Sequence, residues 1–285
     1  MLQKGGEIHP FITKYIFTPL IWIIALLFII PIIWMLIGAL RPSQEIIQSS
    51  QSLSWFTIIP SRITLENFSL LLSGPFRSGI KNSFIVTFIA VVGGVGICAM
   101  AAFGLSAIKW KYRNILFAVV IICFTVPVDS VAIPLSIILK KANLQNTYAS
   151  LILPWFVDGM AIFLLRQFFL AIPSELVDSA RVDGAGWWTI FTKIYIPLSK
   201  PALIGAGLMI FLVEWEAYLW PLLVTTKDYM DVAPLAMVKV VLGRYYTDWG
   251  QMFASAVILA AIPALILLPL QNYFTQSIKT TGIKE

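Results

Sequence analysis

Six long apolar segments dominate this sequence, and each has the length that a helix needs to cross a lipid bilayer. A bilayer-crossing helix takes about 20 predominantly apolar residues. Segments of this kind cover residues 17–40, 83–108, 115–139, 149–169, 202–224 and 252–274. The sequence therefore predicts an all-α integral membrane protein with about six transmembrane helices.

The composition of the 285-residue chain agrees with a membrane bundle. Hydrophobic residues make up 59% of the chain and charged residues 12%, whereas a soluble domain has roughly 45–50% apolar and about 25% charged residues. No long polar stretch remains for a second core, so we expect one transmembrane domain over residues 1–285. The net charge of +6 is spread over short loops, which fits lipid head groups better than a nucleic-acid-binding face.

Side chains that commonly carry chemistry are few. Cys98 and Cys123 lie inside apolar segments without metal-type or disulfide-type spacing, and we interpret them as packing residues with no metal site. The single histidine, His9, precedes the first apolar segment and is interpreted as a cytoplasmic tail residue. That first segment is too long for a cleavable signal peptide, so we expect it to be retained as a span.

The distribution of Lys and Arg sets the expected orientation. Six spans place both termini on one side, and cytoplasmic loops carry an excess of Lys and Arg. The dense cluster at residues 109–113 favours cytoplasmic termini. The loop at about 170–201 is then cytoplasmic, and the loops at about 41–81 and 225–251 are external.

The cytoplasmic loop has the local signals of two short helices joined at a glycine. Ser174 after Pro173 is a good N-cap, and Glu175 follows in the first turn, where the helix dipole favours an acid. The first helix is expected to run to about residue 183, where Gly184 can adopt a left-handed conformation. A second helix over 187–194 is expected to stop at Pro197. The loop is either an interfacial segment anchored by tryptophans 187 and 188 or a docking element for a soluble partner.

The same loop resembles the EAA loop of binding-protein-dependent ABC importer permeases. The tripeptide 178–180, Asp-Ser-Ala, stands where the family has Glu-Ala-Ala, and Gly184 follows after three residues. Ile194, Ile196 and Pro197 then fall at the family's spacing. The residues to which this resemblance assigns a role in coupling to an ATPase are Glu175, Asp178, Ser179, Ala180, Asp183, Gly184, Ala185, Ile194 and Pro197.

Other stretches resemble the carbohydrate branch of that family, specifically the smaller membrane subunit of maltose-type importers. They occur along nearly the whole chain, at residues 65–69, 82–83, 133–135, 163–169, 215, 219–222 and 280–282. The resemblance implies a type I ABC importer fold, in a multi-pass protein of the bacterial cell membrane.

The resemblance also implies partners. Two homologous permease subunits would form the translocation path, two cytoplasmic ATPase subunits would drive it, and an extracytoplasmic solute-binding protein would dock on the loop at 225–251. The tail at 279–285 resembles tails that touch the ATPase pair. The chain has no phosphate-binding loop of its own, so it is expected to be no enzyme and to bind no cofactor, with ATP and Mg²⁺ held by the partner ATPase.

Four acidic residues lie within or beside the apolar segments, where ionisable groups are functional candidates. With their aromatic neighbours they give the candidate substrate path: Asp129, Asp158, Glu214, Trp215, Glu216, Tyr218 and Trp220. The acids could contact solute, pair with the partner subunit or lie at the interface. The family usually has Trp-Asn-Glu at 215–217 and often Gln at 129, so no known solute site transfers to this chain.

Two other functions are compatible with the sequence. A stand-alone ion-coupled secondary transporter would use the intramembrane acids as ion sites, but such folds tend to carry internal repeats, and none is evident here. A polytopic membrane enzyme has little support without a metal or nucleophile motif. Disaccharides, oligosaccharides, glycosyl-polyols and glycerol phosphates all remain candidate solutes, and the lack of intramembrane Lys or Arg weighs mildly against a phosphorylated one.

Overall fold

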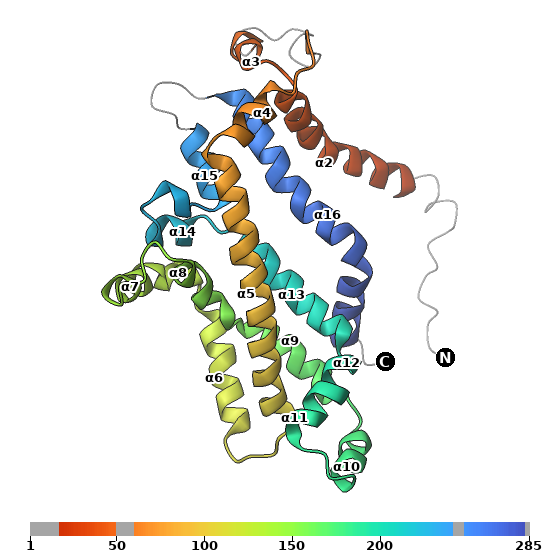
Figure 1. Ribbon diagram of the computed structural model, residues 1–285. Coiled ribbons are helices and arrows are strands. Elements are labelled where there is room, and N and C mark those ends of the chain that lie inside the picture. The colour runs from red at the N-terminus through yellow and green to blue at the C-terminus, as the bar shows by residue number, and fades with distance from the viewer. Residues whose placement is uncertain (1–16, 50–59, 242–247, 283–285) are drawn as a thin grey trace. The chain divides into compact units, whose positions relative to one another are not determined.

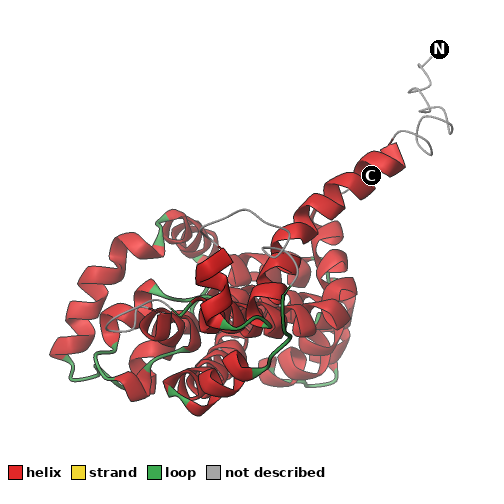
Figure 2. Cartoon of the chain, turned by 90° about the horizontal axis from the view of Figure 1, so that it is seen from above, coloured by secondary structure: helices red, strands yellow, loops and turns green. Residues whose placement is uncertain are grey.

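The computed structural model describes residues 17–49, 60–241 and 248–282 (Figures 1 and 2). Every regular element among these residues is a helix. The chain divides into two compact units. Unit 1 comprises residues 1–73 and 240–258, and unit 2 comprises residues 74–239 and 259–285. The helical architecture predicted from the apolar segments is confirmed.

Unit 1 contains α2 (Thr18–Ala39), α3 (Ser43–Ser49), α4 (Glu66–Ser73) and the first residues of α16 (Trp249–Gly282). The amide nitrogen Nδ2 of the buried Asn67 donates to the carbonyl oxygens of Ala39 at 2.9 Å and Arg41 at 2.7 Å. These bonds satisfy carbonyls at the end of α2 that have no partner within the helix.

Unit 2 is built on α5 (Pro75–Ser106), α9 (Gly159–Leu170) and α13 (Lys200–Trp215), which pack together. Glycines of α5 also allow a close approach to residues 153–156, just before α9. A Cβ atom at Gly93 would lie 2.5 Å from the ring of Phe156, and one at Gly94 would lie 2.9 Å from the carbonyl oxygen of Trp155. Small residues thus set the packing distance, as is common in membrane bundles.

Two of the six predicted spans are bent helix pairs, and a third bent pair joins part of the predicted cytoplasmic loop to the fifth span. α6 (Arg113–Thr125) and α7 (Val128–Lys141) meet at 96°. α8 (Tyr148–Ile152) with the 3₁₀ segment η3 (Leu153–Phe156) meets α9 at 40°, and the helices from Trp187 to Leu198 meet α13 at 82°. The described chain therefore has three long apolar helices, or up to six spans if each bent pair counts as one.

The bend in the third span has a local cause. Val126 precedes Pro127 and has φ −77° and ψ 120°, because a residue before proline is forced away from the helical region. A single helix over 115–139 is therefore wrong. The fifth segment is also divided, since α13 ends at Trp215 and α14 covers Leu219–Val224.

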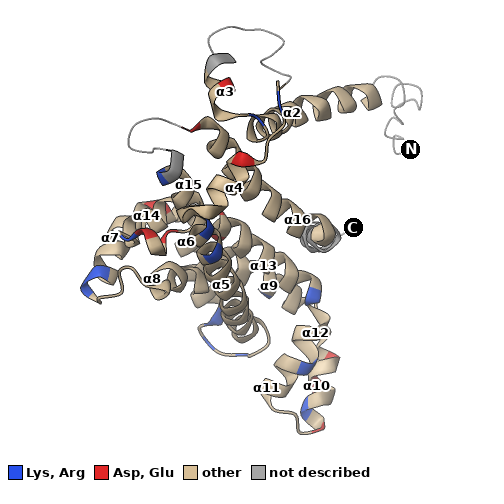
Figure 3. Cartoon of the chain, turned by 45° about the horizontal axis from the view of Figure 1, so that its top comes forward, with Lys and Arg blue, Asp and Glu red and all other residues tan. Residues whose placement is uncertain are grey.

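The remaining elements of unit 2 lie at its two ends. The short 3₁₀ segment η5 (Asp228–Met230) and α15 (Ala233–Val241) follow α14. The α5–α6 turn and α10 (Ser174–Val182) lie together at the opposite end (Figure 1). Lysines and arginines mark that turn (Figure 3), as the predicted cytoplasmic side requires.

Candidate functional site

The helix α10 opens the element that resembles an EAA loop. Pro173 takes the N-cap position with ψ 132°, and no side chain caps the helix. The prediction that Ser174 is the N-cap is wrong, because Ser174 is already the first helical residue. Glu175 lies in the first turn as predicted, where a carboxylate is favoured by the helix dipole.

The turn after α10 has the predicted left-handed glycine. Gly184 has φ +81°, and the next amide, of Ala185, donates to the carbonyl oxygen of Ala180 at 2.9 Å. This pattern is typical of a glycine-terminated helix. The guanidinium of Arg181 also lies 4.9 Å from the ring centroid of Trp187 and donates to the carbonyl oxygen of Ala185 at 3.3 Å. One cation–π contact and several hydrogen bonds therefore fix the angle between the two helices.

The second part of the element is longer than predicted. It comprises α11 (Trp187–Ile190), a π-helical turn (Phe191–Tyr195) and α12 (Ile196–Leu198). The predicted stop at Pro197 is wrong, since the helical path ends at Ser199. Pro197 lies in the first turn of α12, where the missing amide hydrogen costs little. We call residues 174–198 the projecting element.

Aromatic rings attach the projecting element to α5 and α9. Phe103, near the end of α5, has ring centroids of Trp187, Phe191 and Tyr195 at 6.2, 5.1 and 4.9 Å. The ring of Tyr195 also meets Phe169 of α9 edge to face at 5.2 Å. Contacts of this geometry add about 0.5–1.5 kcal/mol each beyond the burial of area. Phe103 and Arg181 are functional candidates that the motif comparison missed.

The residues assigned to coupling divide into an exposed and a packed set. Glu175, Asp178, Ser179, Asp183, Gly184 and Pro197 are exposed, whereas Ala180, Ala185 and Ile194 are half-buried and pack on the core of unit 2. Two large apolar side chains of the projecting element are also exposed to solvent: Val182 is 87% exposed and Trp188 is 67% exposed. An exposed apolar pair on a braced, charged helical element is typical of a docking surface.

Two of the candidate path acids lie at helix N-termini created by the bends. Asp158 is the N-cap of α9, and its Oδ1 accepts from the amide of Ala161 at 2.6 Å. Asp129 lies exposed in the first turn of α7. The positive end of a helix dipole therefore stabilises each carboxylate, in place of a Lys or Arg partner.

The remaining path candidates lie at the end of α13 and beyond. Trp215 and Trp220 are buried, and their indole nitrogens donate to the carbonyl oxygens of Leu259 at 3.1 Å and Ser150 at 3.0 Å. Glu214 is 5% exposed, and its Oε2 has no hydrogen-bond partner among the described residues. Glu216 and Tyr218 are exposed in the break between α13 and α14.

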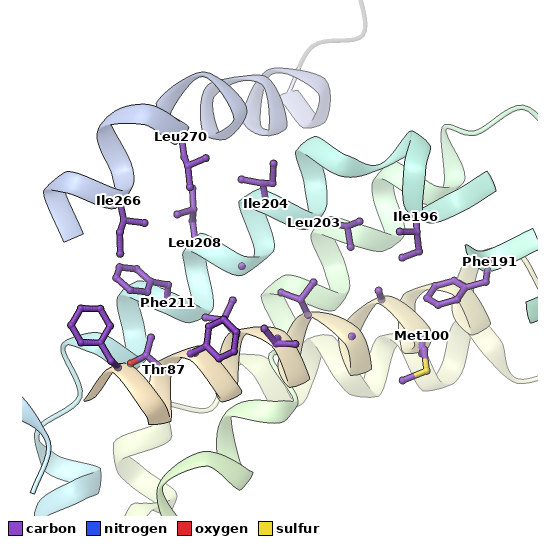
Figure 4. Close-up of a pocket in the computed structure, with 18 of the residues that line it drawn as sticks. Thr87, Met100, Phe191, Ile196, Leu203, Ile204, Leu208, Phe211, Ile266 and Leu270 are labelled. Carbon is purple, nitrogen blue, oxygen red and sulfur yellow. The ribbon is translucent and has the colours of Figure 1, made fainter. Parts of the chain in front are cut away.

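A large groove in unit 2 was not predicted from the sequence. It has a volume of about 820 Å³ and lies between α5, α13 and the later part of α16 (Figure 4). Apart from the hydroxyl of Thr87 and the indole of Trp188, its lining side chains are hydrocarbon or thioether. Such a lining offers few hydrogen-bonding groups to the hydroxyls of a sugar, so the groove does not fit a sugar site.

The decisive comparison is with a protein family. Residues 94–280 match the family described as the inner membrane component of binding-protein-dependent transport systems. The chain belongs to this family. The match begins within α5 and contains the whole projecting element, which includes the EAA-like residues.

Relatives along most of the chain are permeases of the same kind. The AraQ permease of an arabinooligosaccharide transport system from Bacillus subtilis is 31% identical over 264 residues, covering 92% of each chain. The UgpE permease of an sn-glycerol-3-phosphate transport system from Salmonella typhi is 32% identical over 231 residues, covering 78% of this permease and 82% of UgpE.

A solved structure shows the same fold. A chain of a bacterial ABC transporter that imports the acidic polysaccharide alginate superimposes with a TM-score of 0.80 at 20% identity, over 95% of this permease and 100% of that chain. A second structure of an alginate transporter, in complex with its alginate-pentasaccharide-bound periplasmic protein, gives a TM-score of 0.59 at 18% identity. The predicted type I importer fold and the multi-pass membrane location of this permease are thereby confirmed.

Proposed function

We propose that this permease forms half of the translocation path of an ABC importer for a sugar or sugar-like solute. The projecting element at 174–198 couples that path to a cytoplasmic ATPase. The observation that carries the proposal is the construction of this element: it is closed by a left-handed Gly184, braced by Arg181, and exposes Val182 and Trp188.

Coupling requires an element that moves as one piece with the spans. The ring contacts of Phe103 attach the projecting element to α5, a helix of 32 residues and hence about 48 Å long. A push on the projecting element is therefore delivered directly to a helix that spans the bilayer. Nucleotide chemistry belongs to two ATPase partners, which hold ATP and Mg²⁺.

A second homologous permease completes the path. α2 is apolar on every side, with a mean hydropathy of 3.0 over its candidate span, so its whole circumference requires lipid or another membrane helix. The groove between α5, α13 and α16 is equally apolar. Both surfaces suit a chain that is assembled with a partner subunit in the bilayer and has cytoplasmic termini.

The solute path is proposed to use the exposed acids at the helix breaks. Glu216 and Tyr218 together offer a carboxylate that accepts from sugar hydroxyls and an aromatic face that stacks on a sugar ring. Asp129 lies at another break. Broken spans are favourable positions for a binding site, because their ends expose polar backbone groups within the membrane.

One experiment separates this proposal from an ion-coupled transporter. The complete importer is reconstituted in liposomes with its ATPase and its own solute-binding protein, and uptake of a labelled oligosaccharide is followed. The proposal expects uptake only when ATP and the binding protein are both present. Uptake by the permease alone, down an ion gradient and without ATPase, would show that the proposed function is wrong.

A further inference from the structure

Two glycines leave free space in the apolar groove of unit 2. Gly96 of α5 and Gly207 of α13 both line the groove. A Cβ atom added at Gly96 would have no neighbour within 4 Å, and one at Gly207 would meet only the side chains of Val91 and Val95, each at 3.5 Å. These glycines therefore widen the groove, unlike Gly93, which allows close packing.

The groove is long enough for a lipid chain and is accessible from the side. Its lining on α5 runs from Phe84 to Met100, a distance of about 24 Å along the helix. Half of the hydrocarbon core of a bilayer is about 15 Å thick, which corresponds to about ten helical residues. Near the cytoplasmic end of the groove, Val92 and Met100 are 59% and 45% exposed. The cytoplasmic half of the groove thus lies at the depth of the acyl chains of the cytoplasmic leaflet.

An exposed lysine lies at the cytoplasmic end of the groove. Lys200 begins α13, one turn before Ile204 and three turns before Phe211, and both of these residues line the groove (Figure 4). The three residues therefore share one face of the helix. Lys200 forms no salt bridge with a carboxylate of the described residues. A lysine at the end of a span extends its ammonium to the membrane surface, so the groove ends at a positive charge.

We propose that the cytoplasmic half of the groove binds an acyl chain of an anionic phospholipid, whose phosphate lies at the ammonium of Lys200. The lining side chains contact the hydrocarbon chain, and a basic residue at the membrane surface attracts a negative head group. The bound lipid would stay on the permease and is not a transported solute. The inference therefore does not depend on the proposed function.

A helix of the partner permease is the main alternative occupant. A helix with its side chains is about 10–12 Å wide, so a length of about 24 Å takes up about 1,900 Å³ or more. The groove has a volume of about 820 Å³, so a helix could enter it only along one edge, whereas an acyl chain can lie inside. An apolar helix would also bring no negative charge to Lys200, whereas a phospholipid does.

The test is photolabelling of the complete importer in phosphatidylcholine nanodiscs. A minor share of the lipid is phosphatidylglycerol with a diazirine in its acyl chain, and the labelled residues are mapped by mass spectrometry. We expect adducts on the groove residues of α5 and α13. Excess unlabelled phosphatidylglycerol should abolish these adducts, whereas the same excess of phosphatidylcholine should not, because only the former is anionic.

Two glycine substitutions on α5 form a matched pair for this assay. Gly96→Phe places a ring in the groove. Gly104→Phe is the control, because a Cβ atom at Gly104 also has no neighbour within 4 Å and Gly104 is not part of the groove lining. We expect the groove adducts to be lost in Gly96→Phe and to stay at the wild-type level in Gly104→Phe.

Two lysine substitutions test the contact with the head group. We expect Lys200→Gln to lower the preference for phosphatidylglycerol over phosphatidylcholine about fivefold, the effect of one lysine near a membrane surface. Lys109→Gln is the control, because Lys109 is exposed in the α5–α6 turn and does not belong to the groove lining. It should leave the preference unchanged.

Wild-type groove adducts in Gly96→Phe would overturn the lipid site. If that variant does not assemble, the wild-type importer decides: an absence of groove adducts, or adducts that survive excess phosphatidylglycerol, would overturn the site. An unchanged lipid preference in Lys200→Gln would overturn the contact with the phosphate. Since no readout here is uptake, a failure of the proposed function would leave this inference standing.

Discussion

The rings of Phe103 and Tyr195 lie 4.9 Å apart and meet edge to face. Phe103 belongs to α5 and Tyr195 to the projecting element, so this pair joins a bilayer-spanning helix to the surface proposed to receive the ATPase. At the other end of α5, the side chain of Asn82 donates to the carbonyl oxygens of Tyr229 and Asp231. One helix therefore contacts the projecting element at Phe103 and residues 229–231 at Asn82, about 32 Å apart along its axis.

Loss of the Phe103 ring should uncouple ATP hydrolysis from uptake. Phe103→Ala removes three aromatic contacts, and a Phe→Ala substitution in a core typically costs about 3–5 kcal/mol. We expect an importer that assembles and hydrolyses ATP but moves solute at least about tenfold less per ATP. Uptake and hydrolysis measured together in liposomes check this.

The control for that measurement is Phe117→Ala. Phe117 stacks with Phe163 and lies under Arg166, and among the described residues it makes no ring contact with the projecting element. If Phe117→Ala and Phe103→Ala reduce uptake per ATP equally, the loss is a general packing defect and the coupling role of Phe103 is wrong.

The left-handed glycine of the projecting element gives a second prediction. Neither Gly184 nor Gly186 has a neighbour within 4 Å of an added Cβ atom, but only Gly184 has a positive φ, of +81°. Gly184→Val should therefore disturb the turn by about 1–2 kcal/mol of backbone strain, whereas Gly186→Val should not. We expect uptake to fall in Gly184→Val alone, and similar uptake in the two variants would argue against a fixed angle.

The solute path gives a third prediction. We expect Glu216→Gln and Tyr218→Phe each to raise the KM for solute uptake about tenfold, because both side chains are exposed at a helix break and hydrogen-bond sugar hydroxyls in the proposed path. Asp158→Asn should have little effect, since asparagine is also a good N-cap. An unchanged KM in both Glu216→Gln and Tyr218→Phe, with the complex assembled, would remove these residues from the path.

Glu45 gives a prediction on pH dependence. Burial alone raises the pKa of Glu45, but hydrogen bonds from Ser61 and the charge of Arg41 outweigh it, so the net pKa lies below its usual value of 4.5. A lowered folded-state pKa means that the carboxylate contributes stability above pH 4.5, and that this contribution is lost as pH falls through the folded-state pKa.

Melting temperatures of wild type and Glu45→Gln check this prediction. We expect wild type to be more stable than Glu45→Gln by about 1 kcal/mol near pH 7, and this difference to disappear as the pH is lowered below 4.5. A stability difference that stays constant down to pH 3.5 would show that the Glu45 carboxylate does not act through its charge.

Some features could be predicted from the sequence because each follows from a local rule. Six apolar segments predicted the membrane bundle, and Gly184 after a capped helix predicted the left-handed turn. The helix breaks were harder to predict, because apolar composition does not distinguish a straight span from a bent one. The Val126–Pro127 pair carried the signal for one bend, but prolines 31, 263 and 269 lie within continuous helices.

The attachment of the projecting element to α5 could not be predicted. Phe103 and Tyr195 are 92 residues apart in sequence, as are other partners brought together only by packing. Asn82 and its bonding partners at 229 and 231 are likewise distant along the chain. The resemblance singled out residues 82–83 without a role, and the structure shows their hydrogen bonds with residues 229, 231 and 233.

The central claim, that the projecting element contacts the ATPase, is tested most directly by cross-linking from Val182. A single Val182→Cys, in a chain whose exposed Cys123 is replaced by Ser, is labelled with a photoactivatable maleimide in the complete importer. Tyr229→Cys, at the external end, is the control. We predict an adduct with the ATPase subunit from position 182 and none from position 229. An intact complex that gives no ATPase adduct from position 182 would contradict the account.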